Sequence, residues 1–471
     1  MSTGWRPELH VTAESGILDA AAGMLRYVVG EPDALEIDHW HMFYQYEPTP
    51  GAPTRWAHQV SENTPYDFYE CNDVIAPVGG ETNVYAGSVV ASDNHVDLYF
   101  TSETAAGYSI QVARVEDIDE LCDEIDDELQ IDEGVNRLGA VVEDRGPLTR
   151  FRSPCVVPDW EENDNREQGQ TGWLMLASSG PDESPTPVVL SSSDDSSWSV
   201  VGPLTFNGET GMPDDVIMVA PRLIRLRDEV NGEIRDVLFI TQERDHSDLS
   251  GYLVGTLNGA TYDVITPFQR IDYGHDFTRP RSTNVVPGVF SQDRRLRKAF
   301  IFGLLAPTGR GGDPTTQPTW EAEGWANALS LPRVLTLADG RLYQTPSTGL
   351  PNAVSESERA SMWTGLCEIP VGSAITAEIL DGNGNPAATI IHSGDGITLD
   401  RHDDEAVYAT LTEDDEDNIT IVVDGSTIEV FAGGGAVTMS SRFWPEGGTS
   451  GIRVTAEGDA VINNEWRRGV R

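Results

Sequence analysis

The chain has very few cationic residues. It carries 31 lysines and arginines against 77 aspartates and glutamates, and Lys298 is its only lysine, so the formal net charge is −46. Nucleic acids and anionic membranes are bound through basic surfaces. The composition therefore predicts no nucleic-acid partner and no membrane partner. It indicates a strongly acidic, well-solvated surface.

Cysteine is also scarce. The four cysteines lie far apart and form no CxxC pair: Cys71, Cys122, Cys155 and Cys367. This spacing fits neither a zinc knuckle nor a disulfide-rich scaffold. We therefore predict free and mostly buried thiols.

Long apolar runs are missing as well. No stretch approaches the 18 or so apolar residues of a membrane span. Residues 1–14 lack the basic start and apolar run of a signal peptide. We expect a soluble cytoplasmic protein, and the sequence leaves its oligomeric state open.

Short β-type runs are abundant in the remaining sequence. Runs rich in β-branched and aromatic residues, bounded by Gly, Pro, Asp or Asn, recur along the 471 residues; examples are VDLYFTS, DVLFITQE and KAFIFGLL. Helical apolar spacing at 115–130 permits a short acidic helix, but we interpret the segment as a solvated acidic excursion. Many short strands at regular spacing predict an all-β fold, either a sandwich, a barrel or a propeller.

Two breaks indicate how the chain divides. Residues 307–323 are rich in Pro, Gly and Thr and predict a long loop, and a second break falls at 345–360. Beyond it, the DG pair at 424–425 lies between alternating strands and predicts a hairpin. We expect a first domain over residues 1–350 and a β-sandwich over residues 351–471.

Seven stretches resemble, in order, the motifs of one family. They are HMFYQYEP at 41–48, WAHQVS at 56–61, YAGSVV at 85–90, IDYGHDF at 271–277, GWANALSLPRVLTLADGRLYQTP at 324–346, DGSTIEVFAGGG at 424–435 and SRFWP at 441–445. Together they are similar to glycoside hydrolase family 32, the β-fructofuranosidases that include invertases, inulinases and levanases. The resemblance implies a five-bladed β-propeller followed by a C-terminal β-sandwich, and it implies no cofactor.

The chemistry of that family depends on carboxylates. A nucleophile and a general acid stand about 5–5.5 Å apart in a retaining glycosidase. The family adds a third carboxylate that binds sugar hydroxyls, and its three carboxylates come from the motifs W-M-N-D-P-N-G, R-D-P and E-C-P. Aligned without gaps, these motifs place Ala20 at the nucleophile, Ser153 at the third carboxylate and Val219 at the acid/base. Because these side chains can neither form a glycosyl ester nor deliver a proton, the resemblance leaves no catalytic residue to assign.

Relocated carboxylates are the alternative. A register shift of one residue could return Asp19 to the nucleophile position, although such a shift normally turns a side chain to the opposite face of a strand. Asp214 or Asp215 could supply the acid, but we interpret both as part of an exposed acidic loop. Asp272 and Asp276 could also be recruited, but Asx turns account for them.

Other family positions retain polar or aromatic residues. The resemblance places Gln45, Trp56, Tyr85 and Arg152, together with Asp19, at the sugar site. Trp56 could stack on a sugar face, and Gln45 and Arg152 could bond its hydroxyls. Equally, these residues could be remnants that hold the centre of the propeller together.

Three histidines lie close in sequence, but we predict no metal site from them. His41 and His58 are explained by the family pattern, and His39 is their neighbour. The leading hypothesis is a catalytically silent family-32-like protein that binds or senses a fructoside-like carbohydrate. The alternatives are an active β-fructosidase with relocated carboxylates such as Asp19, and a structural propeller that serves as an interaction platform.

Overall fold

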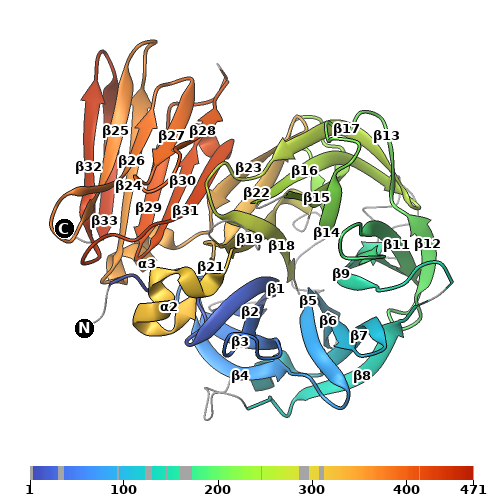
Figure 1. The fold of residues 1–471 in the computed structure, drawn as a ribbon. Helices are drawn as coiled ribbons and strands as arrows, with labels where there is room; N and C mark the ends of the chain where they lie inside the picture. The colour runs from blue at the N-terminus through green and yellow to red at the C-terminus, as the bar shows by residue number, and fades with distance from the viewer. Residues whose placement is uncertain are drawn as a thin grey trace.

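The computed structural model arranges strands as five blades around a central axis, followed by two packed sheets (Figure 1). It describes residues 4–29, 37–92, 95–121, 130–144, 146–159, 172–244, 247–285, 296–306, 312–412 and 414–469. The predicted five-bladed propeller followed by a β-sandwich is confirmed.

Each blade is an antiparallel sheet whose first strand lies nearest the axis. Blade 1 contains β1 (Gly16–Val29), β2 (Ile37–Glu47), β3 (Arg55–Glu62) and β4 (Tyr69–Ile75). Blade 2 contains β5 (Glu81–Ala91), β6 (Val96–Thr104), β7 (Gly107–Val115) and β8 (Val135–Val142). Blade 3 contains β9 (Arg152–Asp159), β10 (Gly172–Ser179), β11 (Thr186–Ser192) and β12 (Ser199–Pro203).

The last two blades carry short additional strands. Blade 4 contains β14 (Ile217–Arg227), β15 (Ile234–Arg244), β16 (Ser247–Asn258) and β17 (Thr261–Arg270), with β13 (Thr205–Asn207) on its outer edge. Blade 5 contains β18 (Phe277–Val285), β19 (Ala299–Leu305), β22 (Arg333–Ala338) and β23 (Arg341–Pro346), with β21 (Ala328–Leu329) paired to β19. The short β20 (Trp325–Ala326) pairs in parallel with β1 of blade 1. The ring closes where the inner strands β1 and β18 pair in parallel.

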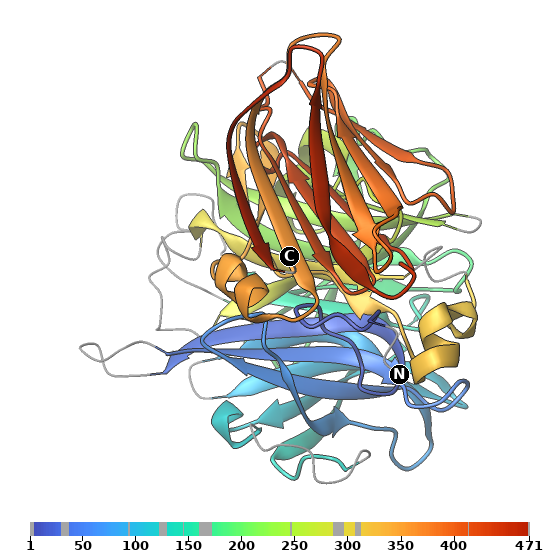
Figure 2. The ribbon, with the colours of Figure 1, turned by 90° about the vertical axis from the view of Figure 1, so that its left-hand side faces the viewer.

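The C-terminal sheets form the sandwich beside blade 5 (Figures 1 and 2). One sheet contains β24 (Ala360–Glu368), β29 (Ile419–Asp424), β30 (Thr427–Ala432), β31 (Val437–Arg442) and β33 (Val461–Gly469). The other contains β25 (Ala374–Asp381), β26 (Pro386–His392), β27 (Gly396–Asp400), β28 (Val407–Thr410) and β32 (Thr449–Glu457). Alternate residues of β25 are buried, as expected for one face packed on a core.

The sharp turn between β29 and β30 confirms the predicted hairpin. Gly425 has a φ of 55°, which a residue with a Cβ adopts less readily. The short helix α3 (Leu350–Glu356) lies between the propeller and the sandwich in sequence.

The segment predicted as a long loop is partly helical. It contains the 3₁₀ turn η4 (Pro314–Thr316) and the helix α2 (Pro318–Glu323). Asp313 caps η4 by accepting a hydrogen bond from the backbone N–H of Thr315. Both η4 and α2 begin with a proline, at a position where a backbone N–H would have no partner within the helix. Composition alone predicted a loop because Pro and Thr are also frequent in loops.

Two further predictions are only partly covered by the described residues. In 115–130 the structure shows η1 (Ile118–Leu121), and the rest up to residue 129 lies outside the described residues. The thiols of Cys71, Cys155 and Cys367 are free and buried, as predicted, whereas Cys122 lies outside the described residues. The helices in the described ranges are too short and too polar to cross a lipid bilayer.

A buried charge cluster joins the sandwich to the propeller. Arg333 is fully buried, and its Nη2 lies 2.9 Å from an oxygen of Asp272 and 3.1 Å from an oxygen of Glu429. Asp272 also accepts from the backbone N–H of Ser440 at 2.9 Å. Asp276 accepts from Arg401 at 2.9 Å and from a backbone N–H of β31. Asp272 and Asp276 therefore serve the domain interface.

The N-terminal segment crosses to the sandwich before the propeller begins. Asp424 accepts from the backbone N–H groups of Leu9 and His10. The imidazole of His10 lies between two carboxylates, with Nδ1 2.8 Å from Asp424 and Nε2 3.2 Å from Glu429. Burial alone would lower the pKa of His10, but the hydrogen bonds with both carboxylates outweigh burial and raise it.

We predict that His10→Asn lowers the free energy of unfolding by about 2 kcal/mol at pH 6. A raised pKa makes the protonated form favour folding. This contribution is therefore complete below the unfolded pKa of about 6.5 and is lost as pH rises through the higher folded value. Denaturant unfolding at several pH values between 6 and 9 measures the difference from the parent. The control is His402→Asn, because the ring of His402 is exposed and bonds Thr389 on the surface. If the difference in the free energy of unfolding between variant and parent stayed constant or grew with pH, His10 would not be protonated in the folded protein as proposed.

Candidate functional site

The innermost strand of every blade carries a β-bulge close to the axis. In β9, Ser153 and Pro154 together stand opposite one residue of β10, Ala177. The same bulge, in which two residues of the inner strand lie opposite one residue of the next strand, occurs in β1, β5, β14 and β18. The first residues of these bulges, one from each blade, are called here the axial residues: Asp19, Ala86, Ser153, Ala220 and Arg279.

The register of β1 changes the assignment made from the sequence. Asp19 and Ala20 stand together opposite Gln45, so Asp19 corresponds to Ser153 of blade 3, and Ala20 corresponds to the residue after it. A second bulge at Ala22 accommodates one additional residue before the strand continues. The gap-free alignment, which put the nucleophile position on Ala20, therefore does not match this register. In a regular strand, a shift of one residue would turn Asp19 to the opposite face. A bulge reverses the alternation of side chains, so this reason against Asp19 does not apply here.

Burial agrees with the corrected register. Ala20 is 4 % exposed and packs in an apolar cluster with Phe43 and Trp56, as does Ala22. Asp19 is partly exposed. The alanines of the DAAAG stretch are therefore core residues, and Asp19 is the residue of this stretch that is available for chemistry.

Gln45 holds Asp19 in place. Its Nε2 donates to the Asp19 carboxylate, and its Oε1 accepts from the backbone N–H of Ala86 at 2.7 Å. Gln45 therefore links blade 1 to blade 2 beside the axis. Asp19 also lines a cavity of about 410 Å³ whose walls include Glu47 and Asp313.

The axial residue of blade 3 is bonded to a buried arginine. Arg222 follows the bulge of β14 and is 1 % exposed. Its guanidinium donates to the carbonyl oxygen of Ser153 at 2.9 Å and to the hydroxyl of Ser153 at 3.1 Å. Ser153 has a φ of 57°, in the left-handed region. A neutral hydroxyl next to a cation thus occupies the position that the family resemblance assigns to the third carboxylate.

Val219 has a carboxylate on the same face of its sheet. Glu243 of β15 pairs with Ile217, two residues before Val219, so its side chain and that of Val219 point to one side. Arg279 donates to Glu243 at 3.0 Å and to Asp248 at 2.9 Å. No sequence motif marks Glu243, and only the pairing of β14 with β15 brings it close to Val219.

The other acidic candidates lie elsewhere. Asp214 and Asp215 are exposed in the segment that precedes β14. Asp272 and Asp276 hold the domain interface.

The stacking role expected of Trp56 does not fit the structure. Its side chain is fully buried, with its ring edge-on to Phe100 at a centroid distance of 6.4 Å. A sugar cannot reach its face without opening the core of blades 1 and 2. The family motif marks Trp56 correctly as a fixed aromatic residue, but this fold uses it for packing.

Tyr85 and Arg152 are engaged with neighbouring groups. The hydroxyl of Tyr85 donates to Glu103 at 2.6 Å. Arg152 donates to the carbonyl oxygen of Gly180 at 2.7 Å and forms an ion pair with Asp182 at 3.2 Å. Both residues are partly exposed, so both remain within reach of a ligand.

The histidine cluster is a buried hydrogen-bonded pair. Nδ1 of His41 lies 3.0 Å from Nε2 of His58, and the rings are stacked. Burial lowers the pKa of His58 to about 3, and burial followed by the neighbouring His58 lowers that of His41. Both rings are therefore neutral, and one donates to the other inside blade 1.

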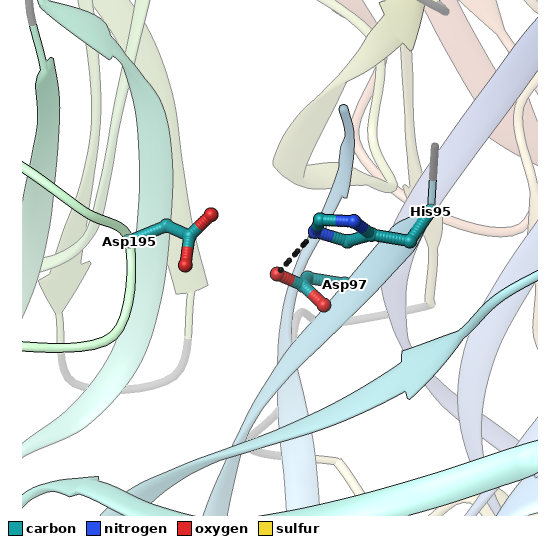
Figure 3. Close-up of side chains that lie close together, drawn as sticks. All are labelled: His95, Asp97 and Asp195. Atoms are coloured by element: carbon teal, nitrogen blue, oxygen red, sulfur yellow. Dashed lines mark ion pairs between the residues drawn. The ribbon is translucent and has the colours of Figure 1, made fainter. Parts of the chain in front are cut away.

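A second group with metal-ligand chemistry joins blades 2 and 3. Figure 3 shows His95, Asp97 and Asp195 facing one another. Arg114 donates to both oxygens of Asp97, at 2.7 and 2.9 Å, and Nε2 of His95 lies 3.4 Å from the same carboxylate. A guanidinium thus already compensates the charge of these carboxylates, and the group stabilises the contact between blades.

Comparison with protein families agrees with this architecture. The model of the glycosyl hydrolases family 32 N-terminal domain matches residues 32–346, and that of the family 32 C-terminal domain matches residues 392–466. The chain belongs to glycosyl hydrolase family 32. The first match begins beyond β1, so it does not include the stretch that carries Asp19.

Several curated relatives match this chain over nearly its whole length. It is 24% identical to a sucrose-6-phosphate hydrolase of Bacillus subtilis, covering 97% of this chain and 93% of that one. It is 25% identical to a sucrose-6-phosphate hydrolase of Vibrio alginolyticus, covering 93% and 86%. It is 22% identical to a raffinose invertase of Escherichia coli, covering 98% and 94%.

Solved structures show the same fold at lower identity. A β-fructofuranosidase of Bombyx mori in complex with sucrose has a TM-score of 0.72 and 17% identity, covering 100% of this chain and 95% of that one. A sucrose-6-phosphate hydrolase of Lactobacillus gasseri has a TM-score of 0.72 and 18% identity, covering 99% and 93%.

We predict that Trp56→Ala acts on stability. Removing a fully buried indole should lower the free energy of unfolding by about 3–5 kcal/mol, because it leaves a cavity in the apolar cluster. Denaturant unfolding measures this loss. Trp466→Ala is the control, because its side chain is 41% exposed, and it should cost less than about 1 kcal/mol. A Trp56→Ala protein that is as stable as the parent and has lost only its affinity for saccharides would instead show that Trp56 stacks on the sugar.

Proposed function

We propose that this family 32 protein binds a carbohydrate without hydrolysing it. The observation that carries the proposal is Val219, an isopropyl side chain where the family's acid/base carboxylate is expected. Both retaining and inverting glycosidases need a proton donor for the leaving oxygen. A chain without this donor retains positioning groups but lacks the group that cleaves the bond.

The carboxylate of Glu243 is a poor substitute for the donor. Arg279 donates to it at 3.0 Å, so the structure uses Glu243 as an acceptor. A general acid must instead carry a proton and point it at the leaving oxygen. Arg279 also holds Asp248, which leaves the guanidinium between two carboxylates.

Retained polar groups near the axis support binding. Asp19 and Gln45 form a bonded pair beside a cavity, and Tyr85 and Arg152 remain partly exposed. The relatives are named for sucrose 6-phosphate and raffinose, and one solved neighbour holds sucrose. We therefore propose a fructoside-like saccharide as the ligand of this chain.

A hydrolase that uses Asp19 as its nucleophile is the second candidate. The bulge in β1 favours it, because Asp19 occupies the bulge position that Ser153 occupies in blade 3. This candidate requires Glu243 or another group to act as the acid. A propeller that serves only as an interaction platform is the third candidate, and it predicts no saccharide binding at all.

We predict that the parent protein releases fructose from sucrose, sucrose 6-phosphate and inulin no faster than buffer does. The double variant Ser153→Asp/Val219→Glu should gain measurable release, because Asp19 then has an acid and a third carboxylate around it. Either single change should fail, since these groups act as a unit. Fructose release is followed by chromatography, and calorimetry with the same saccharides tests binding by the parent.

Asp19→Asn added to the double variant is the matched control. It should abolish the gained release while leaving the fold unchanged. Release by the unmodified protein that disappears in both Asp19→Asn and Glu243→Gln would identify the second candidate and refute the first. Absence of binding heat for every saccharide would favour the interaction platform.

A further inference from the structure

Arg222 is a buried cation whose contacts are all neutral. It is 1 % exposed and donates to the carbonyl oxygens of Ser153 and Pro221 and to the Ser153 hydroxyl. Burial lowers the pKa of Arg222 to about 10; the nearby Cys155 opposes this shift, and the nearby cation Arg279 adds to it. A buried charge without a counter-ion is strongly unfavourable. The geometry therefore calls for an anion at this place.

Three other arginines with buried side chains among the described residues lie near carboxylates. Arg333 contacts Asp272 and Glu429, and Arg225 contacts Asp236 at 2.7 Å.

Arg442 donates to the carbonyl and hydroxyl oxygens of Ser426, as Arg222 does to those of Ser153, but the nearby carboxylate of Asp276 offsets its charge. In contrast, none of the hydrogen bonds of Arg222 goes to a carboxylate. The described residues therefore supply no carboxylate to Arg222, which leaves its charge available to an anion of a ligand.

Ser153 connects this charge to the axis. Its carbonyl and hydroxyl oxygens both accept from Arg222, and its backbone N–H donates to Thr101 at 2.9 Å. The hydroxyl proton is then left to donate to a ligand, and Ser153 is partly exposed where Arg222 is not. A hydroxyl that accepts from a guanidinium is polarised, so its own proton becomes a better donor to an anion.

We infer that Ser153, backed by Arg222, binds an anionic group of the saccharide ligand, either a phosphate or a carboxylate. Ser153 would contact the ligand, and Arg222 is a positioning residue that acts through it. The inference rests on the proposed function, because it adds a charge to the proposed saccharide. The acidic surface of the protein does not oppose it, since salt screens exposed charges over about 8–10 Å.

The experiment is calorimetry on the full chain with four probes: fructose, fructose 6-phosphate, galacturonate and inorganic phosphate. The parent should bind fructose 6-phosphate or galacturonate at least tenfold more tightly than fructose, as expected for a charge-assisted hydrogen bond. Ser153→Ala and Arg222→Met should each weaken binding of fructose 6-phosphate more than binding of fructose, so that the tenfold preference is lost. Arg453→Met, which removes an exposed arginine of the sandwich paired with Glu378, should change neither affinity.

Ser153→Asp provides a test that does not depend on the folding of Arg222→Met. It supplies a carboxylate next to Arg222, so it should raise the melting temperature in phosphate-free buffer and abolish the further rise that phosphate gives the parent. A Ser153→Asp protein that melts below the parent and still responds to phosphate would overturn the inference.

The outcomes separate the inference from the proposed function. Equal affinity of the parent for fructose and for both acidic sugars would overturn the anion site and leave the proposed saccharide binding intact. Binding of inorganic phosphate that depends on Ser153, with no heat from any sugar, would support the anion site and refute the proposed saccharide binding.

Discussion

The two-against-one bulge in each inner strand is the constraint on which this site depends. It places one axial residue per blade and reverses the alternation of side chains along the strand. In β1 it makes Asp19, not Ala20, the residue that corresponds to Ser153 and Arg279. A second extra residue, Ala22, lets the strand resume its pairing without moving Asp19. The chemistry available near the axis is therefore set by the backbone register as much as by residue type.

The buried polar cluster at the domain interface has a different role. Arg333 binds Asp272 of the propeller and Glu429 of the sandwich, and His10 places a further buried imidazole between Asp424 and Glu429. Buried ion pairs add little net stability, because desolvation offsets their attraction, but removing one partner is costly. The cluster therefore fixes how the two domains meet. The IDYGHDF and EVF motifs supply Asp272 and Glu429 to this cluster.

The polar groups near the axis are held by neighbouring side chains. Ser153 is bonded to a cation, Val219 is apolar, and Glu243 is held by Arg279. Asp19 alone among the axial residues carries a carboxylate, and Gln45 fixes it. These groups present fixed donors and acceptors, which recognition of a ligand requires.

The family motifs, the short strands and the turn residues could be read from the sequence, because they report local backbone preference and packing that every family 32 fold shares. They predicted the propeller, the sandwich and the hairpin at Gly425. They could not settle the roles of Asp19, Ala20 and Trp56, because a bulge and complete burial are decided by neighbouring strands. Glu243 and Arg222 carry no motif, and only the pairing of β14 with β15 and its packing against β9 reveals them. The sequence by itself thus determined the architecture. The tertiary structure decided which side chains reach the axis and which cation lacks an anion, since both depend on contacts between segments distant in sequence.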